Sequence, residues 1–422
     1  MDKRRYGKTL SACLAGVSNQ AIITNVTALL FVPFAGLYGF SLARLGLLTA
    51  VNFAAQMCAD VFLMFFIDRL SYRALALAAS AASAAGLLFY GLVPMLFSGA
   101  ALYGGIVAAT AVFAFAGGML EVVLSNVADS LPEESSLSIC LLHTVYAWAQ
   151  AVLALALCGC LFFFGAKNWN FAMFALALVP AAAFALLIGA ETGDKERKAD
   201  FKGRKRRMDK ADGKNGCARF PATSGGKSRF GVFYLFALAA IFFGYGSEVA
   251  MNQWVSTLFS ETFASAGYNA EFFGAAAFAA FLGIGGLFYV RISGKRAKFP
   301  FSALIFAALA TCVCYVAASG EGAFSFAAAL ACGLVVGFLS PGIMTASAQN
   351  LPRAGGRMLA SLAVFADLGA AVLPSAAGAL SEIFGLKSSF LLLSAAPLCC
   401  ALAAAAMRLR KKTPRAPLYS EK

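Results

Sequence analysis

The chain has 422 residues, of which 61% are hydrophobic and 13% charged, and its formal net charge is +14. A soluble globular domain is usually about half apolar and a quarter charged, so this composition excludes a soluble enzyme or binding domain. It indicates an integral membrane protein. Since a membrane-spanning helix needs roughly 20 apolar residues, the chain has room for about twelve spans.

The first half of the chain predicts six apolar spans separated by short polar turns. Their expected bounds are Thr9–Pro33, Ala43–Phe66, Ala74–Phe97, Ala100–Ala128, Leu137–Gly165 and Trp169–Ala190. The first of them follows a basic N-terminus, as the apolar part of a signal peptide would, but it is too long for a typical signal sequence. We therefore interpret it as the first membrane span.

A basic polar run over residues 191–229 follows the sixth span. Its segment GRKRRMDK resembles a nucleic-acid or nuclear-targeting patch. Between two sets of membrane spans, a solvated cytoplasmic linker that contacts anionic lipid is the better interpretation. The later segment GGKS is not a phosphate-binding loop, because Pro221 stands where the first glycine of that motif should be. We expect no binding of nucleic acid or ATP.

The second half predicts six further spans. Their expected bounds are Phe230–Phe259, Ala270–Val290, Phe299–Ala318, Ala323–Ala348, Met358–Ile383 and Ser388–Met407. The segment SNVADSLPEESSLSICLL, from Ser125, aligns without gaps with TASAQNLPRAGGRMLASL, from Thr345, at an offset of 220 residues. A duplicated helix bundle explains this repeat. The predicted organisation is an N-terminal six-helix bundle (1–190), a basic linker (191–229) and a C-terminal six-helix bundle with a basic tail (230–422).

Basic residues alternate along the chain. They cluster at the N-terminus, in the turns after the second and eighth spans, in the linker and in the C-terminal tail, whereas the turns between carry Arg44, Lys167 and Lys387. This distribution follows the positive-inside rule. It predicts a multi-pass protein of the cytoplasmic (inner) membrane with both termini in the cytoplasm. The eleven cysteines lie mostly inside spans and without metal-ligand spacing, so we expect neither metal nor cofactor.

The turn IDRLSYR after the second span resembles a loop of the major facilitator superfamily with the pattern G-x-x-x-D-[RK]-x-G-[RK]-[RK]. Asp68, Arg69 and Arg73 match this pattern, and Ser71 stands at its second glycine. The resemblance implies an all-α membrane protein of twelve transmembrane helices in two pseudo-symmetric six-helix bundles, usually monomeric, that transports solutes and is not an enzyme. It also implies that the matching residues form a conformational latch, although positive charge that only sets the topology is the alternative.

Two longer segments are similar to the fucose-permease-like branch of sugar transporters. They are EVVLSNVADSLPEESSLSICLLHTVYAWAQ, from Glu121, and GYGSEVAMNQW, from Gly244. The likeness implies proton-coupling and substrate-orienting positions at Glu121 and His143. Each of these residues is eleven positions from Pro132, so on adjacent antiparallel helices both should lie at one depth. A carboxyl group beside an imidazole can carry a proton, and a structural Glu–His hydrogen bond is the alternative.

Polar side chains inside the spans are candidates for substrate binding, because polar and ionisable groups in a membrane usually line a cavity. Asn52, Gln56 and Asp60 recur every four residues and share a helix face. The full set of candidates is Asn25, Asn52, Gln56, Asp60, Asn126, Tyr146, Gln150, Glu248, Asn252, Gln253, Trp254 and Asp367. Amides and aromatic rings suit a hydroxylated ligand. Polar contacts between helices are the alternative, and Asp367 could equally be a second coupling site.

These features predict a secondary active transporter of a small polar solute, a sugar or related metabolite, driven by proton symport. A drug or metabolite efflux antiporter is the first alternative, but such proteins usually carry a Gly-Pro-rich fifth span, and the fifth span here has no proline. A membrane sensor that no longer transports is the second alternative.

Overall fold

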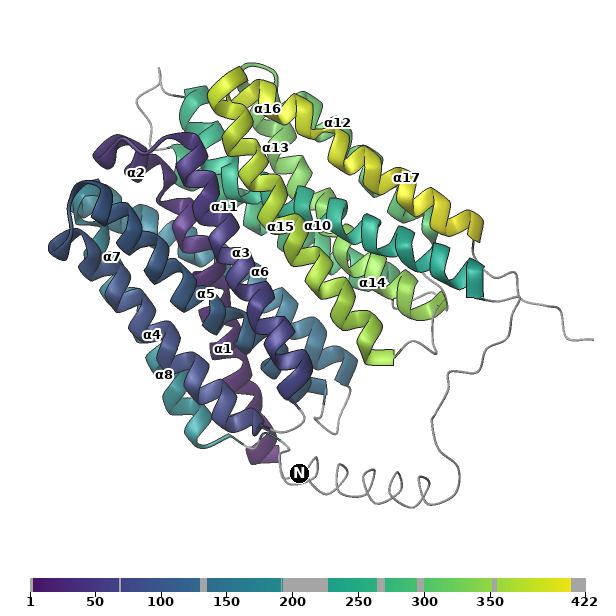
Figure 1. Cartoon of the computed structure of the whole chain (residues 1–422), viewed down its shortest axis with the longest axis horizontal. Helices are drawn as coiled ribbons and strands as arrows, with labels where there is room; N and C mark the ends of the chain where they lie inside the picture. Colours follow the sequence, from purple (N-terminus) through teal and green to yellow (C-terminus); the bar gives the residue numbers. More distant parts are fainter. Residues whose placement is uncertain are drawn as a thin grey trace, which may run out of the picture.

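The computed structural model describes residues 3–67, 70–129, 135–190, 192, 227–263, 270–293, 300–350 and 355–410. Within these ranges every regular element is a helix. Figure 1 shows two groups of long helices lying beside each other, the first coloured purple to teal and the second teal to yellow. The architecture is therefore that of an all-α protein.

Among the described residues, the N-terminal group contains eight α-helices and one short 3₁₀-helix, η1. Their bounds are α1 Lys3–Leu29, α2 Phe31–Tyr38, α3 Leu42–Phe66, α4 Tyr72–Leu96, α5 Gly99–Asp129, α6 Ser135–Phe164, η1 Ala166–Asn168, α7 Trp169–Leu176 and α8 Leu178–Ile188. The first predicted span corresponds to α1 with α2, and the sixth to α7 with α8.

The described part of the C-terminal group contains eight α-helices. Their bounds are α10 Lys227–Phe263, α11 Ala270–Ser293, α12 Phe301–Ala318, α13 Gly322–Val336, α14 Leu339–Asn350, α15 Gly355–Phe384, α16 Leu386–Leu393 and α17 Ala395–Arg410. The tenth predicted span corresponds to α13 with α14, and the twelfth to α16 with α17.

Four spans are divided into two helices, and each division has the same cause. Pro33, Pro180, Pro341 and Pro397 are the third residues of α2, α8, α14 and α17. Proline has no backbone N–H and would clash inside a continuous helix. In the first turn of a new helix the missing N–H costs nothing, because that group has no intrahelical partner. The chain therefore restarts its helix just before each proline.

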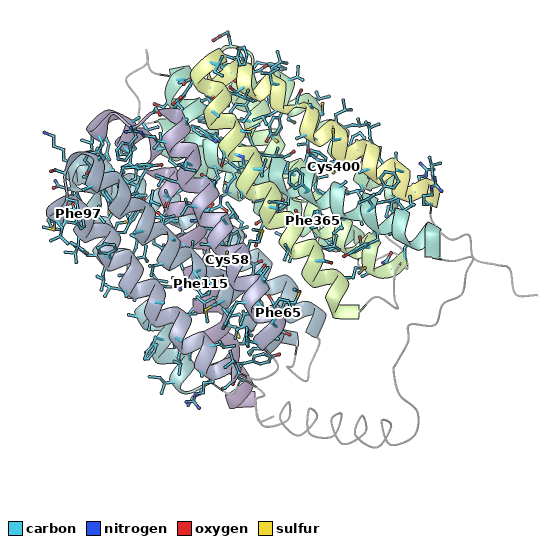
Figure 2. All side chains as sticks on the ribbon, viewed as in Figure 1. Cys58, Phe65, Phe97, Phe115, Phe365 and Cys400 are labelled. Carbon is cyan, nitrogen blue, oxygen red and sulfur yellow. The ribbon has the colours of Figure 1, made fainter. Side chains whose placement is uncertain are left out.

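Eleven stretches of the described residues are long and apolar enough to cross a membrane, and a shorter apolar helix, Phe273–Tyr289, lies within α11. All twelve predicted spans thus fall on apolar helices, which confirms the predicted membrane architecture. The outer surfaces of these helices carry large apolar side chains, as expected of surfaces that face lipid. Phe65 is 66% exposed and Phe97 39% exposed (Figure 2).

The two groups meet mainly along two helix pairs, α3 with α15 and α6 with α11. Shorter contacts join α10 to α1 and α2. The predicted domain boundaries at residues 190 and 230 flank residues 193–226, which lie outside the described ranges, so these boundaries stay a prediction.

Candidate functional site

Helices α3 and α15 touch backbone to backbone where α3 begins. A Cβ atom added to Gly378 would lie 2.5 Å from Leu42 O, and one added to Gly46 would lie 3.2 Å from Ser375 Cα. Ser375 Oγ donates to Gly46 O over 3.0 Å. Only glycine permits this approach, since any other residue would place a side chain between the helices. We call this end of the molecule, where α2 and α16 lie in the upper part of Figure 1, the sealed end.

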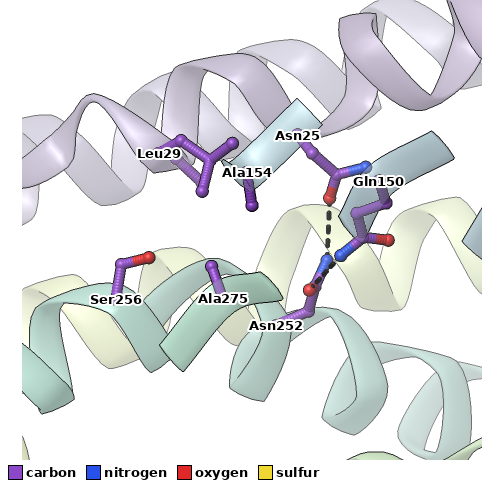
Figure 3. Close-up of a pocket in the computed structure, with 8 residues that line it drawn as sticks. Asn25, Leu29, Gln150, Ala154, Asn252, Ser256 and Ala275 are labelled. Atoms are coloured by element: carbon purple, nitrogen blue, oxygen red, sulfur yellow. Dashed lines mark hydrogen bonds between the residues drawn. The ribbon is translucent and has the colours of Figure 1, made fainter. Parts of the chain in front are cut away.

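A chain of amide side chains crosses between the two groups (Figure 3). Gln150 Nε2 donates to Asn252 Oδ1 over 2.5 Å, and Asn252 Nδ2 donates to Asn25 Oδ1 over 2.8 Å. Asn25 Nδ2 in turn donates to Tyr146 Oη over 3.2 Å and to Ala21 O over 2.9 Å. Helices α1, α6 and α10 are therefore linked by one directional series of hydrogen bonds.

The two residues after Asn252 also contact other elements of the seam. Gln253 Nε2 donates to Thr24 O over 3.2 Å, and its Oε1 lies 3.5 Å from Thr49 Oγ1. The fully buried ring of Trp254 lies 5.0 Å from that of Phe31, and its Nε1 donates to Pro374 O over 2.9 Å. Three consecutive residues of α10 thus contact α1, α2, α3 and α15.

A small cavity lies beside the amide chain. Its volume is about 10 Å³, enough for about one water molecule. It is lined by Asn25, Ala28, Leu29, Gln150, Ala154, Asn252, Ser256 and Ala275. Gln150 is 4% exposed, and its Oε1 has no hydrogen-bond partner within the described part of the chain. A buried acceptor of this kind needs a donor from a water molecule or a ligand.

Three acidic side chains form a second cluster, which we call the acidic centre: Asp60, Glu121 and Asp367. Glu248, like Glu121, is within electrostatic range of Tyr146 and Tyr245. The side chains of Asp60 and Asp367, from opposite groups, lie next to each other, and both are within electrostatic range of Glu121. Glu121 Oε2 accepts from Gln20 Nε2 over 2.5 Å, and Glu248 Oε2 accepts from Ser340 Oγ over 3.1 Å.

The acidic centre contains a side chain that solvent can reach. Glu121 is exposed, yet it is within electrostatic range of Asp60, Tyr146 and Tyr245, from three other helices. The amide chain, in contrast, is closely packed, since Asn25 is 3% exposed. The seam therefore combines an accessible carboxylate with a buried amide chain.

The polar stripe on α3 divides between two environments. Asn52 Nδ2 donates to Ile23 O over 3.0 Å, and Gln56 Nε2 donates to Asn52 Oδ1 over 2.6 Å. Both amides are 2% exposed and bind within the N-terminal group. Asp60 alone of the stripe reaches the C-terminal group, through its contact with Asp367. The prediction that Asn52 and Gln56 line a ligand site stays a prediction.

Other predicted residues lie apart from these clusters. Asn126 is exposed, and its Nδ2 donates to Val122 O of its own helix over 2.7 Å. His143 belongs to α6, in a segment for which only the helical backbone is described. Asp68 and Arg69 lie outside the described residues, and Arg73 is exposed at the start of α4. The Glu121–His143 pair and the conformational latch therefore stay predictions.

Several residues of the site were not predicted from the sequence. Gln20, Ser340 and Glu382 each bond to a group on another helix. A glutamine within the first span was the only signal for Gln20, while Ser340 and Glu382 had none, because a lone polar residue near a helix end has no periodic pattern. Among the described residues, no group of three or more His, Cys, Asp or Glu is arranged to hold a metal ion.

The sequence profile of the Major Facilitator Superfamily matches residues 10–355 and, in a second match, residues 275–422. The chain belongs to the major facilitator superfamily. Proteins of this superfamily are transporters, so the chain is a membrane transporter and not an enzyme, as the sequence predicted. Among curated proteins, no sequence matches the chain.

Solved structures of superfamily members share the fold of this transporter. The xylose transporter XylE from E. coli, in a partially occluded inward open conformation, has a TM-score of 0.71 and 10% identity, over 94% of this chain and 98% of that chain. The E. coli fucose:proton symporter FucP has a TM-score of 0.62 and 16% identity, over 97% and 99%. The nucleoside transporter NupG has a TM-score of 0.67 and 13% identity, over 95% and 98%. These likenesses confirm the predicted major facilitator fold.

Proposed function

We propose that this transporter moves a sugar or a related small polar metabolite across the cytoplasmic membrane by alternating access, in symport with protons. The observation that carries the proposal is the amide chain from Gln150 through Asn252 to Asn25, which joins both groups at one place. A ligand bound there would be held by both groups at once. Its hydroxyl groups could replace the amide–amide hydrogen bonds, because amides both donate and accept.

Alternating access needs a site that opens to one side of the membrane at a time. Glu121 in the acidic centre is accessible, while the glycine contact between α3 and α15 brings the two halves together at the sealed end. The distribution of basic residues favours the cytoplasm as the side from which Glu121 is reached. In the proposed cycle the halves 1–190 and 230–422 of a monomer rock about the seam, and residues 191–229 connect them.

Proton coupling is assigned to Glu121, with His143 as its proposed partner on α6. Glu121 is exposed and is held by Gln20. A carboxyl group that gains or loses a proton there changes the charge beside the ligand site. The neighbouring carboxyl groups of Asp60 and Asp367 supply further acidic side chains on the seam. The coupled proton and the ligand would therefore act on the same helices.

The test is uptake of a panel of radiolabelled sugars, nucleosides and related polar metabolites into proteoliposomes under an inward proton gradient. We expect the intact protein to accumulate one member of the panel. We expect Glu121→Gln to lose gradient-driven accumulation and to retain exchange of ligand across the membrane. Glu261→Gln, which removes a carboxylate at the end of the seventh span, is the matched control and should accumulate normally.

Accumulation by Glu121→Gln equal to that of the intact protein would contradict the assignment of the proton to Glu121. If no member of the panel is transported by the intact protein, the proposed substrate class is wrong. The efflux antiporter and the sensor are then the hypotheses to test, by drug export from loaded vesicles and by ligand binding without flux.

A further inference from the structure

Glu382, near the end of α15, is bonded to the first turn of α3 in the other half of the molecule. Its Oε1 accepts a hydrogen bond from the backbone N–H of Ala43 over 3.0 Å. Ala43 is the second residue of α3, and the first four N–H groups of a helix have no intrahelical partner. Another of these groups, Arg44 N–H, is bonded by Ser41 Oγ over 3.4 Å. Helix α3 therefore has one cap from its own N-cap residue and one from the opposite half.

The cap reaches α3 because of how α15 is packed. Ser375, Gly378 and Glu382 follow one another at spacings of three and four, so they lie on one face of α15. Ser375 binds Gly46 O, and Gly378 lies against Leu42 O. The same face that brings the backbones together thus directs the Glu382 carboxylate to the N-terminus of α3.

The electrostatic surroundings favour a carboxylate at this position. The N-terminus of a helix carries a partial positive charge, so an anion there is stabilised. Arg44 adds a full positive charge within electrostatic range of Glu382. The Arg44 guanidinium lies 5.7 Å from the centre of the Tyr103 ring, and Tyr103 Oη donates to Arg44 O over 2.9 Å. Arg44 is therefore held beside the cap.

We propose that Glu382 is a reversible cap on α3 that stabilises the closed form of the sealed end. When the halves separate there, the Ala43 N–H loses its partner in α15 and the helix end is left to water. This proposal goes beyond the proposed transport function. It depends on that function in one respect, since the two halves must separate at the sealed end. It requires no particular substrate and no coupled proton.

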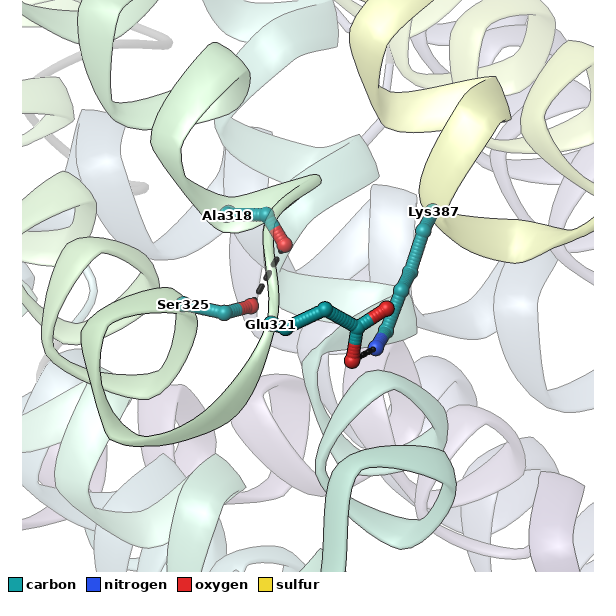
Figure 4. Close-up of polar contacts among 4 residues, drawn as sticks. All are labelled: Ala318, Glu321, Ser325 and Lys387. Carbon is teal, nitrogen blue, oxygen red and sulfur yellow. Dashed lines mark hydrogen bonds and ion pairs between the residues drawn. The ribbon is translucent and has the colours of Figure 1, made fainter.

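A second carboxylate near the sealed end provides a natural control. Glu321, the N-cap residue of α13, forms an ion pair with Lys387 of α16 at 2.5 Å (Figure 4). Both residues belong to the C-terminal half, so this ion pair is kept when the halves separate. Its removal changes the surface charge by the same amount as removal of Glu382, without affecting the cap on α3.

The experiment measures opening of the sealed end directly. Thr49 is 2% exposed and lies on the seam against Gln253 of the other half. The full-length protein is prepared with its native cysteines replaced and with the substitution Thr49→Cys. The rate at which a membrane-impermeant maleimide modifies this single cysteine reports how often the sealed end opens. When opening and closing are fast relative to modification, this rate follows the population of the open form. A second protein that retains only Cys332, which is fully buried in α13, reports unfolding.

We expect Glu382→Ala to raise the modification rate at position 49 by roughly two- to fivefold, the range for an anion at a helix N-terminus. Glu382→Gln keeps a hydrogen-bond acceptor without the charge and should give a smaller increase. Glu321→Gln should give none, and modification of Cys332 should stay unchanged in all variants.

Equal rates at position 49 for Glu382→Ala and the parent would overturn the proposal, as would an equal increase in Glu321→Gln. Faster modification of Cys332 in Glu382→Ala would show that this variant unfolds, and Glu382→Gln would then be the deciding variant. A modification rate at position 49 in Glu382→Gln equal to that of the parent would also overturn the proposal. If Glu382→Ala raises the modification rate at position 49 but the protein transports no solute, the proposed function is wrong and the proposed cap is supported. If the protein transports a solute but Glu382→Ala leaves that rate unchanged, the proposed function is supported and the proposed cap is wrong.

Discussion

The side-chain amide of Gln20 donates a hydrogen bond to the Glu121 carboxylate over 2.5 Å and joins α1 to α5. Glu121 is exposed, whereas Gln20 is 8% exposed. The buried amide therefore holds the carboxylate in one orientation while leaving it accessible. A substitution of Gln20 can therefore perturb Glu121 without removing its carboxyl group.

Replacement of Gln20 should destabilise the protein through Glu121. Gln20→Leu removes the amide donor, and because water can reach the exposed carboxylate in its place, we expect a cost of about 0.5–1.5 kcal/mol, that of an ordinary hydrogen bond. In a Glu121→Leu background the same substitution should cost much less, because no acceptor is left unpaired. Thermal unfolding of the four purified proteins measures this difference. Costs that simply add would show that the two side chains do not interact.

Gln56 and Gln150 should differ in what they affect, although both are buried glutamines. Gln56 binds Asn52 within one half, so Gln56→Leu should lower the unfolding temperature and leave ligand affinity within about twofold. Gln150 has a free acceptor beside the cavity, so Gln150→Leu should weaken binding by roughly tenfold, the effect of one lost hydrogen bond. Equilibrium binding of the transported solute checks both. A tenfold effect of Gln56→Leu would place that residue in the ligand site.

The glycine contact should be sensitive to a single methyl group. In Gly378→Ala the new Cβ would lie 2.5 Å from Leu42 O, so the halves must separate at the sealed end. We expect the state in which the sealed end is closed to be disfavoured by about 1.4 kcal/mol, which lowers its population about tenfold. Exchange of solute should slow by a similar factor. Gly104→Ala, where nothing lies within 4 Å of the new Cβ, is the control and should transport normally. Similar rates for the two variants would show that the close approach has no role in transport.

Asn252 should matter more than an asparagine that bonds only to its own helix. Asn252→Ala removes the acceptor of Gln150 and the donor to Asn25, and so breaks both inter-residue links of the amide chain. We expect the affinity for solute to fall by roughly ten- to a hundredfold. Asn350→Ala, which within the described residues loses a bond to Ala346 O of its own helix, should keep the affinity of the parent. Binding titrations of the two variants decide the matter, and equal affinities would exclude the amide chain from the site.

The spans could be predicted from the sequence because hydropathy over some twenty residues is a local property. The divisions within spans could not. The sequence predicts the end of the first span at Pro33, but the chain continues as α2 to Tyr38. A proline is tolerated both in the first turn of a helix and in a turn between helices. The residue type alone therefore does not show whether a span ends at the proline or continues as a new helix.

The site could be predicted only as faces of single helices. The spacing of Asn52, Gln56 and Asp60 correctly places them on one helix, yet it gives no information about the neighbours of that helix. In the structure two of them bind within the N-terminal half, and Asp60 binds across the seam. Glu382 had no signal at all, because its role depends on the first turn of α3, more than 330 residues away. Contacts of this kind require the arrangement of the two halves to be known.

The chemistry of the contacts at the sealed end also bears on the energy of the transport cycle. Apart from that of Glu382, the described polar contacts that join the two halves there involve amides, hydroxyl groups and backbone carbonyls, as in Asn252 with Asn25 and Ser375 with Gly46. Each such bond contributes only about 0.5–1.5 kcal/mol net, because water replaces it when it breaks. The two end states can therefore be nearly equal in free energy. In that case a ligand that prefers one state by a factor of ten, about 1.4 kcal/mol, shifts the balance as much as one of these bonds does.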